Sequence, residues 1–152
     1  MREIKFRAKR LDNGEWSYGS GLLIADDFCV IDRDTEMYVD EKYEWAGNTH
    51  FFRVAGVMCD LETIGQYTGL KDKNGKEIYE GDILKHSYWD RVPLDVYQQG
   101  GKDEYIEEIL VVKYRVESGR YCADSFTDID MWICEDSEVI GNIYDNPELL
   151  TK

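Results

Sequence analysis

Hydrophobic and polar residues alternate over much of the chain, and this period of two predicts short antiparallel β-strands. Residues 1–10 show the pattern well, with an apolar and a basic face formed by Ile4, Phe6 and Ala8 and by Lys5, Arg7 and Lys9, respectively. We expect a half-buried strand whose basic face is solvated. A strip that tracks nucleic-acid phosphates is the alternative interpretation of that face.

Further strands are predicted from similar runs along the chain. They fall at residues 16–18, 22–24, 28–31, 106–116, 128–134 and 139–144. Asn13-Gly14 marks a turn after the first strand. Residues 51–58 are compatible with either a strand or a short helix. A helical turn is expected near the end of the chain, with Pro147 at its first position.

Residues 64–84 carry the densest local signal. Strands are predicted at 66–68 and 77–79, a turn at 73–76, a bend at 80–82 and a third strand from Ile83. Asn-Gly is typical of a type I′ hairpin turn, whose central residues have positive φ. The segment lacks the phosphate-binding pattern G-x-x-x-x-G-K-[ST]. We therefore interpret four of its residues as structural turn residues: Asn74, Gly75, Gly81 and Asp82.

Residues 85–104 form a polar, aromatic-rich excursion that ends in Gly100-Gly101. The composition predicts a mobile loop or an extended hairpin. Exposed aromatic side chains often anchor protein interfaces, so Tyr88, Trp89 and Tyr97 are candidate partner contacts. The alternative is that they cover the edge of a small barrel.

Composition supports a folded, β-rich protein. Of the 152 residues, 43% are hydrophobic and 13% are aromatic, which is enough to bury a core. We predict two lobes, residues 1–76 and residues 77–152. No apolar run approaches the length of a membrane span, and no apolar segment follows the basic N-terminus as a signal peptide would require. The expected location is cytoplasmic, without a membrane partner.

The formal net charge of −14 narrows the classes of partner. A surface this acidic repels a phosphate backbone, so direct nucleic-acid binding is disfavoured unless the basic N-terminus acts locally. The candidate residues for that exception are Lys5, Arg7, Lys9 and Arg10. The same acidity allows a different hypothesis, in which the protein mimics nucleic acid and inhibits a host enzyme.

No residue pattern predicts a metal or catalytic site. The four cysteines, Cys29, Cys59, Cys122 and Cys134, form no C-x-x-C pair and are expected to be buried free thiols. Neither His50 nor His86 has metal-ligand spacing, and the acidic run from Asp32 fails the EF-hand pattern. Three carboxylates, Asp124, Asp128 and Asp130, could hold a divalent ion for nucleolytic chemistry, but we expect solvated surface. The neighbours His86 and Ser87 lack an identifiable acidic residue that would complete a catalytic triad. The expectation is no catalytic residue, no metal and no cofactor.

Four stretches carry a resemblance to a known family. They are Arg7-Ala8 with its Trp-bearing hairpin, residues 64–72 (IGQYTGLKD), residues 74–83 (NGKEIYEGDI) and residues 139–150 (VIGNIYDNPELL). In order and spacing the sequence resembles the YopX family over essentially its whole length. The resemblance implies a small protein encoded by a bacteriophage or prophage. It also implies a mainly β fold whose second half is SH3-like, and it supplies no catalytic residues.

The fold class that we predict is mainly β (β-rich α+β), an N-terminal antiparallel β meander joined to a C-terminal SH3-like small β-barrel. The function that we predict is that of a non-enzymatic phage or prophage accessory protein. It would act by protein–protein contact, as a homo-oligomer or on a host or phage protein. The first alternative is the acidic inhibitor that mimics nucleic acid. The second is a metal-dependent nucleic-acid enzyme or binder.

Overall fold

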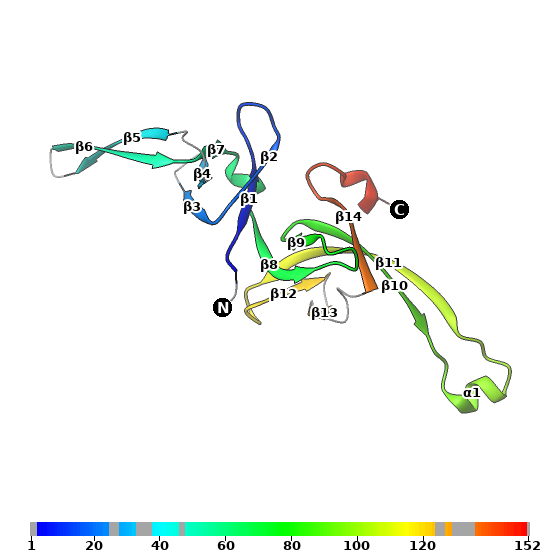
Figure 1. Cartoon of the computed structure of the whole chain (residues 1–152). Helices are drawn as coiled ribbons and strands as arrows, with labels where there is room; N and C mark the ends of the chain where they lie inside the picture. The colour runs from blue at the N-terminus through cyan, green and yellow to red at the C-terminus, as the bar shows by residue number, and fades with distance from the viewer. Residues whose placement is uncertain are drawn as a thin grey trace. The chain divides into compact units, whose positions relative to one another are not determined.

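The computed structural model describes residues 3–24, 28–32, 38–45, 48–123, 127–128 and 136–151. The chain forms two compact units, Met1–Tyr67 and Thr68–Lys152, and it passes from one to the other inside strand β8 (Gly65–Lys71). The boundary predicted from the sequence, after residue 76, falls at the start of β9 (Glu77–Tyr79). Figure 1 shows the strands of both units in chain order.

The first unit consists of short antiparallel strands, one 3₁₀ turn and the beginning of β8. Its elements are β1 (Phe6–Lys9), β2 (Trp16–Gly19), β3 (Gly21–Ile24), β4 (Cys29–Asp32), β5 (Tyr38–Trp45), β6 (Asn48–Ala55), β7 (Val57–Cys59) and η1 (Leu61–Thr63). Strand β1 pairs with β2 and with the start of β8. Strand β4 lies between β3 and β7, and β5 pairs with β6 as a separate hairpin.

Strands β6 and β7 occupy the segment for which sequence reasoning left strand and helix open. Gly56 separates them, and a Cβ atom there would lie 2.6 Å from the Ile31 carbonyl oxygen. Only glycine fits this close approach between two backbones. The backbone contact with β4, which no local periodicity encodes, therefore decides the conformation.

The core of the first unit is small and apolar. Its buried members are Ala8, Cys29, Ile31, Val57 and Cys59, and Phe6, Leu22, Leu61 and Ile64 pack against them. Phe6 and Ala8 lie on the predicted inner face of β1. Two residues of this segment differ from the prediction, because Ile4 is exposed and Arg7 is buried. The Arg7 guanidinium lies 4.7 Å from the centroid of the Trp16 ring, so stacking on an aromatic side chain accompanies its burial.

Two thiols face each other inside this core. Cys29 lies opposite Cys59 in the β4–β7 ladder, and both side chains are fully buried. The hydrogen bond shared with Cys59, together with burial, raises the pKa of Cys29, which is therefore a neutral thiol at neutral pH. The expectation of buried free thiols is confirmed for Cys29, Cys59 and Cys122, and Cys134 lies outside the described residues.

The second unit contains the rest of β8 and the C-terminal strands. Its further elements are β9, β10 (Asp82–Asp90), α1 (Leu94–Gln98), β11 (Glu104–Arg115), β12 (Arg120–Ala123), β13 (Thr127–Asp128), β14 (Ser137–Asn142) and η2 (Pro147–Leu150). The antiparallel sheet has the order β13-β12-β11-β10-β14. Its core joins buried Ile78, Leu84, Val112 and Val139 with Leu70 and Leu110, so the β8–β9 hairpin packs on this sheet.

The mainly β, antiparallel fold class is confirmed by these sheets. Within the described ranges, the five-stranded sheet is open, with β13 and β14 at its edges, and no pairing closes it into a barrel. The SH3-like character of the second unit stays a prediction. Pro147 occupies the first turn of η2, as expected from its fixed φ.

The β8–β9 turn lies one residue earlier than the Asn-Gly pattern predicts. The Gly75 N–H donates to the Asp72 carbonyl at 2.9 Å, which makes Lys73 and Asn74 the central residues of the turn. Gly75 follows with φ +82°. The Asp72 carboxylate accepts hydrogen bonds from the N–H groups of Asn74 (2.8 Å) and Lys76 (2.9 Å), which favours this turn over type I′.

The bend into the sheet is fixed by Gly81 and Asp82. Gly81 has φ +84°; its N–H donates to the Val112 carbonyl and its own carbonyl accepts from Ile143, both at 2.9 Å. The buried Asp82 carboxylate accepts a hydrogen bond from the Tyr79 N–H at 2.8 Å. These contacts place both residues in the framework of the second unit.

Candidate functional site

Strands β10 and β11 extend beyond the sheet that contains them. They pair continuously from Ile83 opposite Val111 to Asp90 opposite Glu104. Strand β14 pairs with β10 only as far as His86, and β12 pairs with β11 only from Val112 onward. We call residues 87–107 the arm. Figure 1 shows this two-stranded ribbon running out from the sheet to α1 at its end.

The end of the arm is held by its own backbone hydrogen bonds. In α1, the Tyr97 N–H donates to the Pro93 carbonyl at 2.9 Å, and the Gly101 N–H donates to the Val96 carbonyl at 3.0 Å. The Asp103 carboxylate accepts from the Val92 N–H at 3.2 Å and so bridges the two sides of the loop. The predicted choice between a mobile loop and an extended hairpin is thus resolved in favour of the hairpin.

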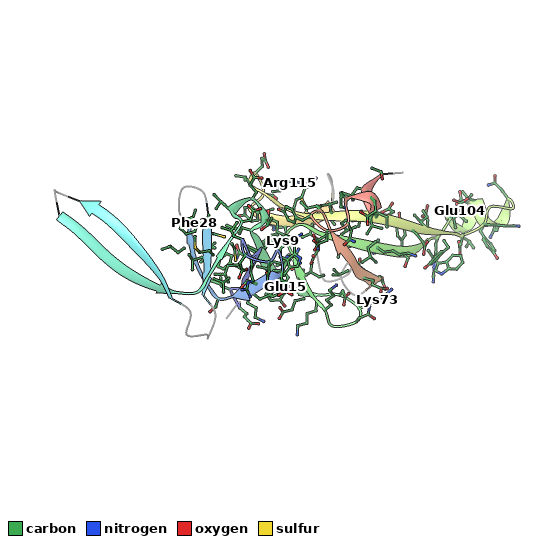
Figure 2. The ribbon with its side chains drawn as sticks, turned by 90° about the horizontal axis from the view of Figure 1, so that it is seen from above. Lys9, Glu15, Phe28, Lys73, Glu104 and Arg115 are labelled. Carbon is green, nitrogen blue, oxygen red and sulfur yellow. The ribbon has the colours of Figure 1, made fainter. Side chains whose placement is uncertain are left out.

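Large apolar side chains are exposed at the end of this arm. We call four of them the tip side chains: Trp89 (61% exposed), Leu94 (72%), Tyr97 (58%) and Tyr105 (54%). Trp89 lies opposite Tyr105 in the ladder, and their ring centroids are 5.3 Å apart. Figure 2 places Glu104, next to Tyr105, at the α1 end of β11, with Arg115 at the other end of the strand.

The three predicted contact residues occupy two different environments. Trp89 and Tyr97 are at the exposed end of the arm, whereas Tyr88 is half-buried. The Tyr88 ring stacks on His86 at 5.3 Å, and its hydroxyl donates to the Glu108 carboxylate at 3.4 Å. Desolvation, together with the Glu108 charge, raises the pKa of Tyr88. The geometry favours Tyr88 as part of the ribbon rather than of the contact surface.

Sequence reasoning missed Leu94 and Tyr105 as candidate contacts. Tyr105 lies just outside the predicted excursion, and only the ladder register brings it against Trp89. Leu94 is the first residue of a short helix, and the sequence pattern of residues 85–104 did not predict that helix. A tryptophan before the loop and a tyrosine after it were the available signal, since cross-strand aromatic pairs are frequent in hairpins.

The end of the arm carries an excess of negative charge. Residues 89–105 contain the carboxylates of Asp90, Asp95, Asp103 and Glu104 and the basic side chains of Arg91 and Lys102. Asp90 and Glu104 are both exposed and lie directly opposite each other in the ladder. Like charges in such a pair destabilise the ribbon. Near the base of the arm, Lys85 and Glu107 form an ion pair at 2.7 Å.

The basic residues of the N-terminal strand are engaged in local contacts. Lys5 pairs with Glu3 at 3.1 Å and lies 5.5 Å from the centroid of the Tyr67 ring. Lys9 lies 5.7 Å from the Trp16 centroid, on the ring that Arg7 also approaches. The Arg10 Nε donates to the Asp12 carboxylate at 2.8 Å. These neighbours neutralise or cover the cations, and the geometry does not favour a phosphate-tracking strip.

The carboxylates of the predicted metal site lie largely outside the part of the chain that the structure describes, so this alternative stays a prediction. Asp124 and Asp130 lie outside the described residues, and for Asp128 only the backbone is described. Among the residues that the structure describes, no group of three or more His, Cys, Asp or Glu side chains could hold a metal ion. The His86 Nδ1 lies 3.1 Å from the Ser137 Oγ rather than forming a pair with its neighbour Ser87. In the same residues, no helix is long and apolar enough to cross a membrane.

Comparisons with known proteins identify relatives over nearly the whole chain. The chain is similar to the crystal structure of protein EF1440 from Enterococcus faecalis, with 26% sequence identity, 97% of each chain covered and a TM-score of 0.52. No curated protein matches the sequence significantly. A family model described as YopX protein matches residues 5–151. The chain therefore belongs to the YopX family.

Proposed function

We propose that this protein is a non-enzymatic accessory protein of a bacteriophage or prophage, which acts in the bacterial cytoplasm by binding another protein through the arm. The observation that carries the proposal is the exposure of four large apolar side chains at the end of a ribbon that leaves its sheet. Trp and Tyr are enriched among the residues that dominate interface energies. The arm would supply such residues from both of its strands.

The energetics of an isolated ribbon support a binding role. A two-stranded hairpin is marginally stable in water, and exposed aromatic side chains gain free energy when they leave water, roughly 25 cal/mol per Å² of apolar surface. The hydrogen bonds of α1 and of the Val92–Asp103 pair hold the end of the arm in one geometry before a partner arrives. Such preorganisation reduces the entropy cost of binding.

The non-enzymatic part of the proposal rests on the lack of a described catalytic arrangement. It is tested by incubating the full chain with Mg²⁺ or Mn²⁺ and single- or double-stranded nucleic acid. We expect no cleavage. Cleavage that disappears in an Asp128→Ala, Asp130→Ala double variant would establish the metal-dependent alternative instead.

The acidic inhibitor that mimics nucleic acid is the second candidate function. The net charge of −14 favours it, because carboxylates can occupy the phosphate sites of a nucleic-acid enzyme. It predicts competition with DNA for a host nuclease or polymerase at low salt. If DNA and this protein bind such an enzyme independently, the mimicry hypothesis fails, whereas binding through the arm remains allowed.

The proposed binding role is tested by shortening the arm. Replacing residues 88–106 by Asn-Gly connects Ser87 to Glu107 through a two-residue turn. Ser87 and Glu107 lie opposite each other in the ladder, so the remaining register is kept. Full-length and shortened chains serve as baits in lysates of the phage-infected or lysogenic bacterium. We expect proteins that the full chain retains and the shortened chain loses. Identical sets of retained proteins would contradict the proposal.

A further inference from the structure

Resting on the proposed function, we infer that the arm docks into an apolar pocket bordered by Lys or Arg side chains on a different protein, not on a second copy of this chain. The tip side chains supply the apolar contact, and the surrounding carboxylates supply the charge complementarity. Both features come from the same short segment, residues 89–105.

The apolar part of the surface has a defined geometry. Trp89 and Tyr105 contact each other across the ladder, while Leu94 and Tyr97 come from α1. The Trp89–Tyr105 pair would enter a pocket as one unit, since each ring restricts the rotamers of the other. Among the described residues, β10 and β11 are the two strands that reach the end of the arm, and a two-stranded ribbon is narrow enough to insert.

The charge around these side chains selects the partner. Asp90 and Glu104 repel each other across the ladder, next to Trp89 and Tyr105 in sequence, and this repulsion weakens the free ribbon. Lys or Arg side chains of a partner would relieve the repulsion and would also interact favourably with the two aromatic faces. A partner with a cationic border therefore gains binding free energy both from the two carboxylates and from the two aromatic rings.

The same charges argue against other occupants. In two copies that met through their arms, each segment 89–105 would present four carboxylates against the two basic side chains of Arg91 and Lys102, so an excess of negative charge would meet an excess of negative charge, within a chain of net charge −14. The phosphates of a nucleic acid would be repelled in the same way. A cationic border on a different protein is the occupant that these charges favour.

The inference is tested with two defined peptides and the full chain. The fluorescent peptides share one Leu- and Phe-rich core and differ only in Lys or Glu flanks, and binding is measured by anisotropy. We expect the Lys-flanked peptide to bind about tenfold more tightly, as two or three exposed charge pairs would provide. High NaCl concentrations should remove most of that preference. Equal affinities, or binding of neither peptide, would overturn the inference.

Local and bulk charge are separated by matched variants. Asp90→Lys with Glu104→Lys should abolish the preference for Lys flanks. Glu117→Lys with Glu148→Lys changes the net charge equally, at exposed positions outside the arm, and should preserve the preference. An equal effect of both double variants would show that only bulk charge matters and would contradict the inference.

The aromatic contribution has an internal control of the same geometry. Tyr114 and Tyr121 also lie opposite each other, on β11 and β12, with ring centroids 5.3 Å apart. Trp89→Ser with Tyr105→Ser should weaken binding of the Lys-flanked peptide at least about tenfold, whereas Tyr114→Ser with Tyr121→Ser should leave it unchanged. Equal losses in the two pairs would contradict docking through the arm.

Two further results would assign the surface to another occupant. Dimerisation of the full chain in light scattering that is lost in the Trp89→Ser, Tyr105→Ser variant would identify a second copy. Displacement of the peptide by single-stranded DNA bound at the arm would identify nucleic acid. If the shortened chain fails to retain proteins that the full chain retains, but both peptides bind the full chain equally, the proposed function stands and the inference of a cationic border is wrong. If shortening has no effect on retained proteins, both fall.

Discussion

At the scale of single residues, Asp72 shows how one buried carboxylate organises a turn. Its two oxygens accept hydrogen bonds from the N–H groups of Asn74, Lys76 and Val139, the last at 3.0 Å. Burial alone would raise the pKa of Asp72, but these hydrogen bonds outweigh burial and lower it below its usual value. The ionised form therefore ties the β8–β9 turn to β14.

We predict that Asp72→Asn lowers the free energy of unfolding at neutral pH by about 1–3 kcal/mol, because the amide replaces a charged acceptor with a weaker one and adds an unpaired N–H group. Since the folded-state pKa is lowered, the stabilisation is present above the unfolded-state pKa and is lost as the pH falls through the folded-state value. Urea unfolding at neutral and acidic pH measures the difference. A gap that stays constant down to strongly acidic pH would contradict this role, and Asp95→Asn, at an exposed position, is the control.

Gly75 and Gly81 provide a second prediction at this scale. Both have positive φ, so alanine at either position costs about 1 kcal/mol of backbone strain. A Cβ at Gly75 meets nothing within 4 Å, whereas one at Gly81 lies 3.3 Å from the Tyr144 ring. Gly81→Ala should therefore be the more destabilising in thermal unfolding. Equal losses of stability would show that the Tyr144 contact has no consequence.

At the scale of elements, alternation in the sequence locates most strands but not their partners. Phe6 and Ala8 are correctly placed on an inner face, while burial of Arg7 depends on Trp16 from the neighbouring strand. The turn at Gly75 is shifted by the Asp72 carboxylate, a longer-range contact than the Asn-Gly pattern includes. Local pattern therefore predicts elements well and their exact ends less well.

The arm illustrates the same limit for the candidate site. Sequence reasoning identified residues 85–104 as an excursion and selected Trp89 and Tyr97, both of which lie exposed at its end. It could not identify the part of the ribbon that extends past the neighbouring described strands, because this depends on where β12 and β14 stop pairing. It also could not separate Tyr88 from Trp89, which differ in burial through the contacts of His86 and Glu108.

For the arm, we predict that Gly101→Ala weakens partner binding with little effect on the stability of the unit. A Cβ at this position would lie 2.8 Å from the Val96 Cγ1 and 2.9 Å from the Val96 carbonyl oxygen, so α1 must move. The core residues of the second unit lie outside residues 87–107, and their packing should persist. Thermal unfolding and peptide anisotropy check the two parts. A large fall in Tm with unchanged binding would show that Gly101 contributes to the stability of the unit rather than to partner binding.

At the scale of the whole molecule, each unit has its own core, and the arm is a part of the second unit that contributes no residue to its core cluster. The first core contains the buried Cys29–Cys59 pair, and the second surrounds Ile78, Leu84 and Val112. We therefore predict that the chain with residues 88–106 replaced by Asn-Gly stays folded, with a β-type circular dichroism spectrum that lacks only the contribution of the arm. Its stability should change by no more than about 1 kcal/mol, since only surface contacts are removed. Loss of cooperative unfolding would show that the arm is needed for folding rather than for binding.

The central claim is that this YopX-family protein contacts its partner through the end of the arm, and site-specific photo-crosslinking tests it most directly. A photoreactive amino acid replaces either Leu94, 72% exposed in α1, or Val116, 80% exposed just after β11 and outside the arm. Irradiation in the bacterium that produces the protein should give a crosslinked product with another protein from position 94 and none from position 116. Products of equal yield from both positions, or a product from position 116 alone, would contradict the claim.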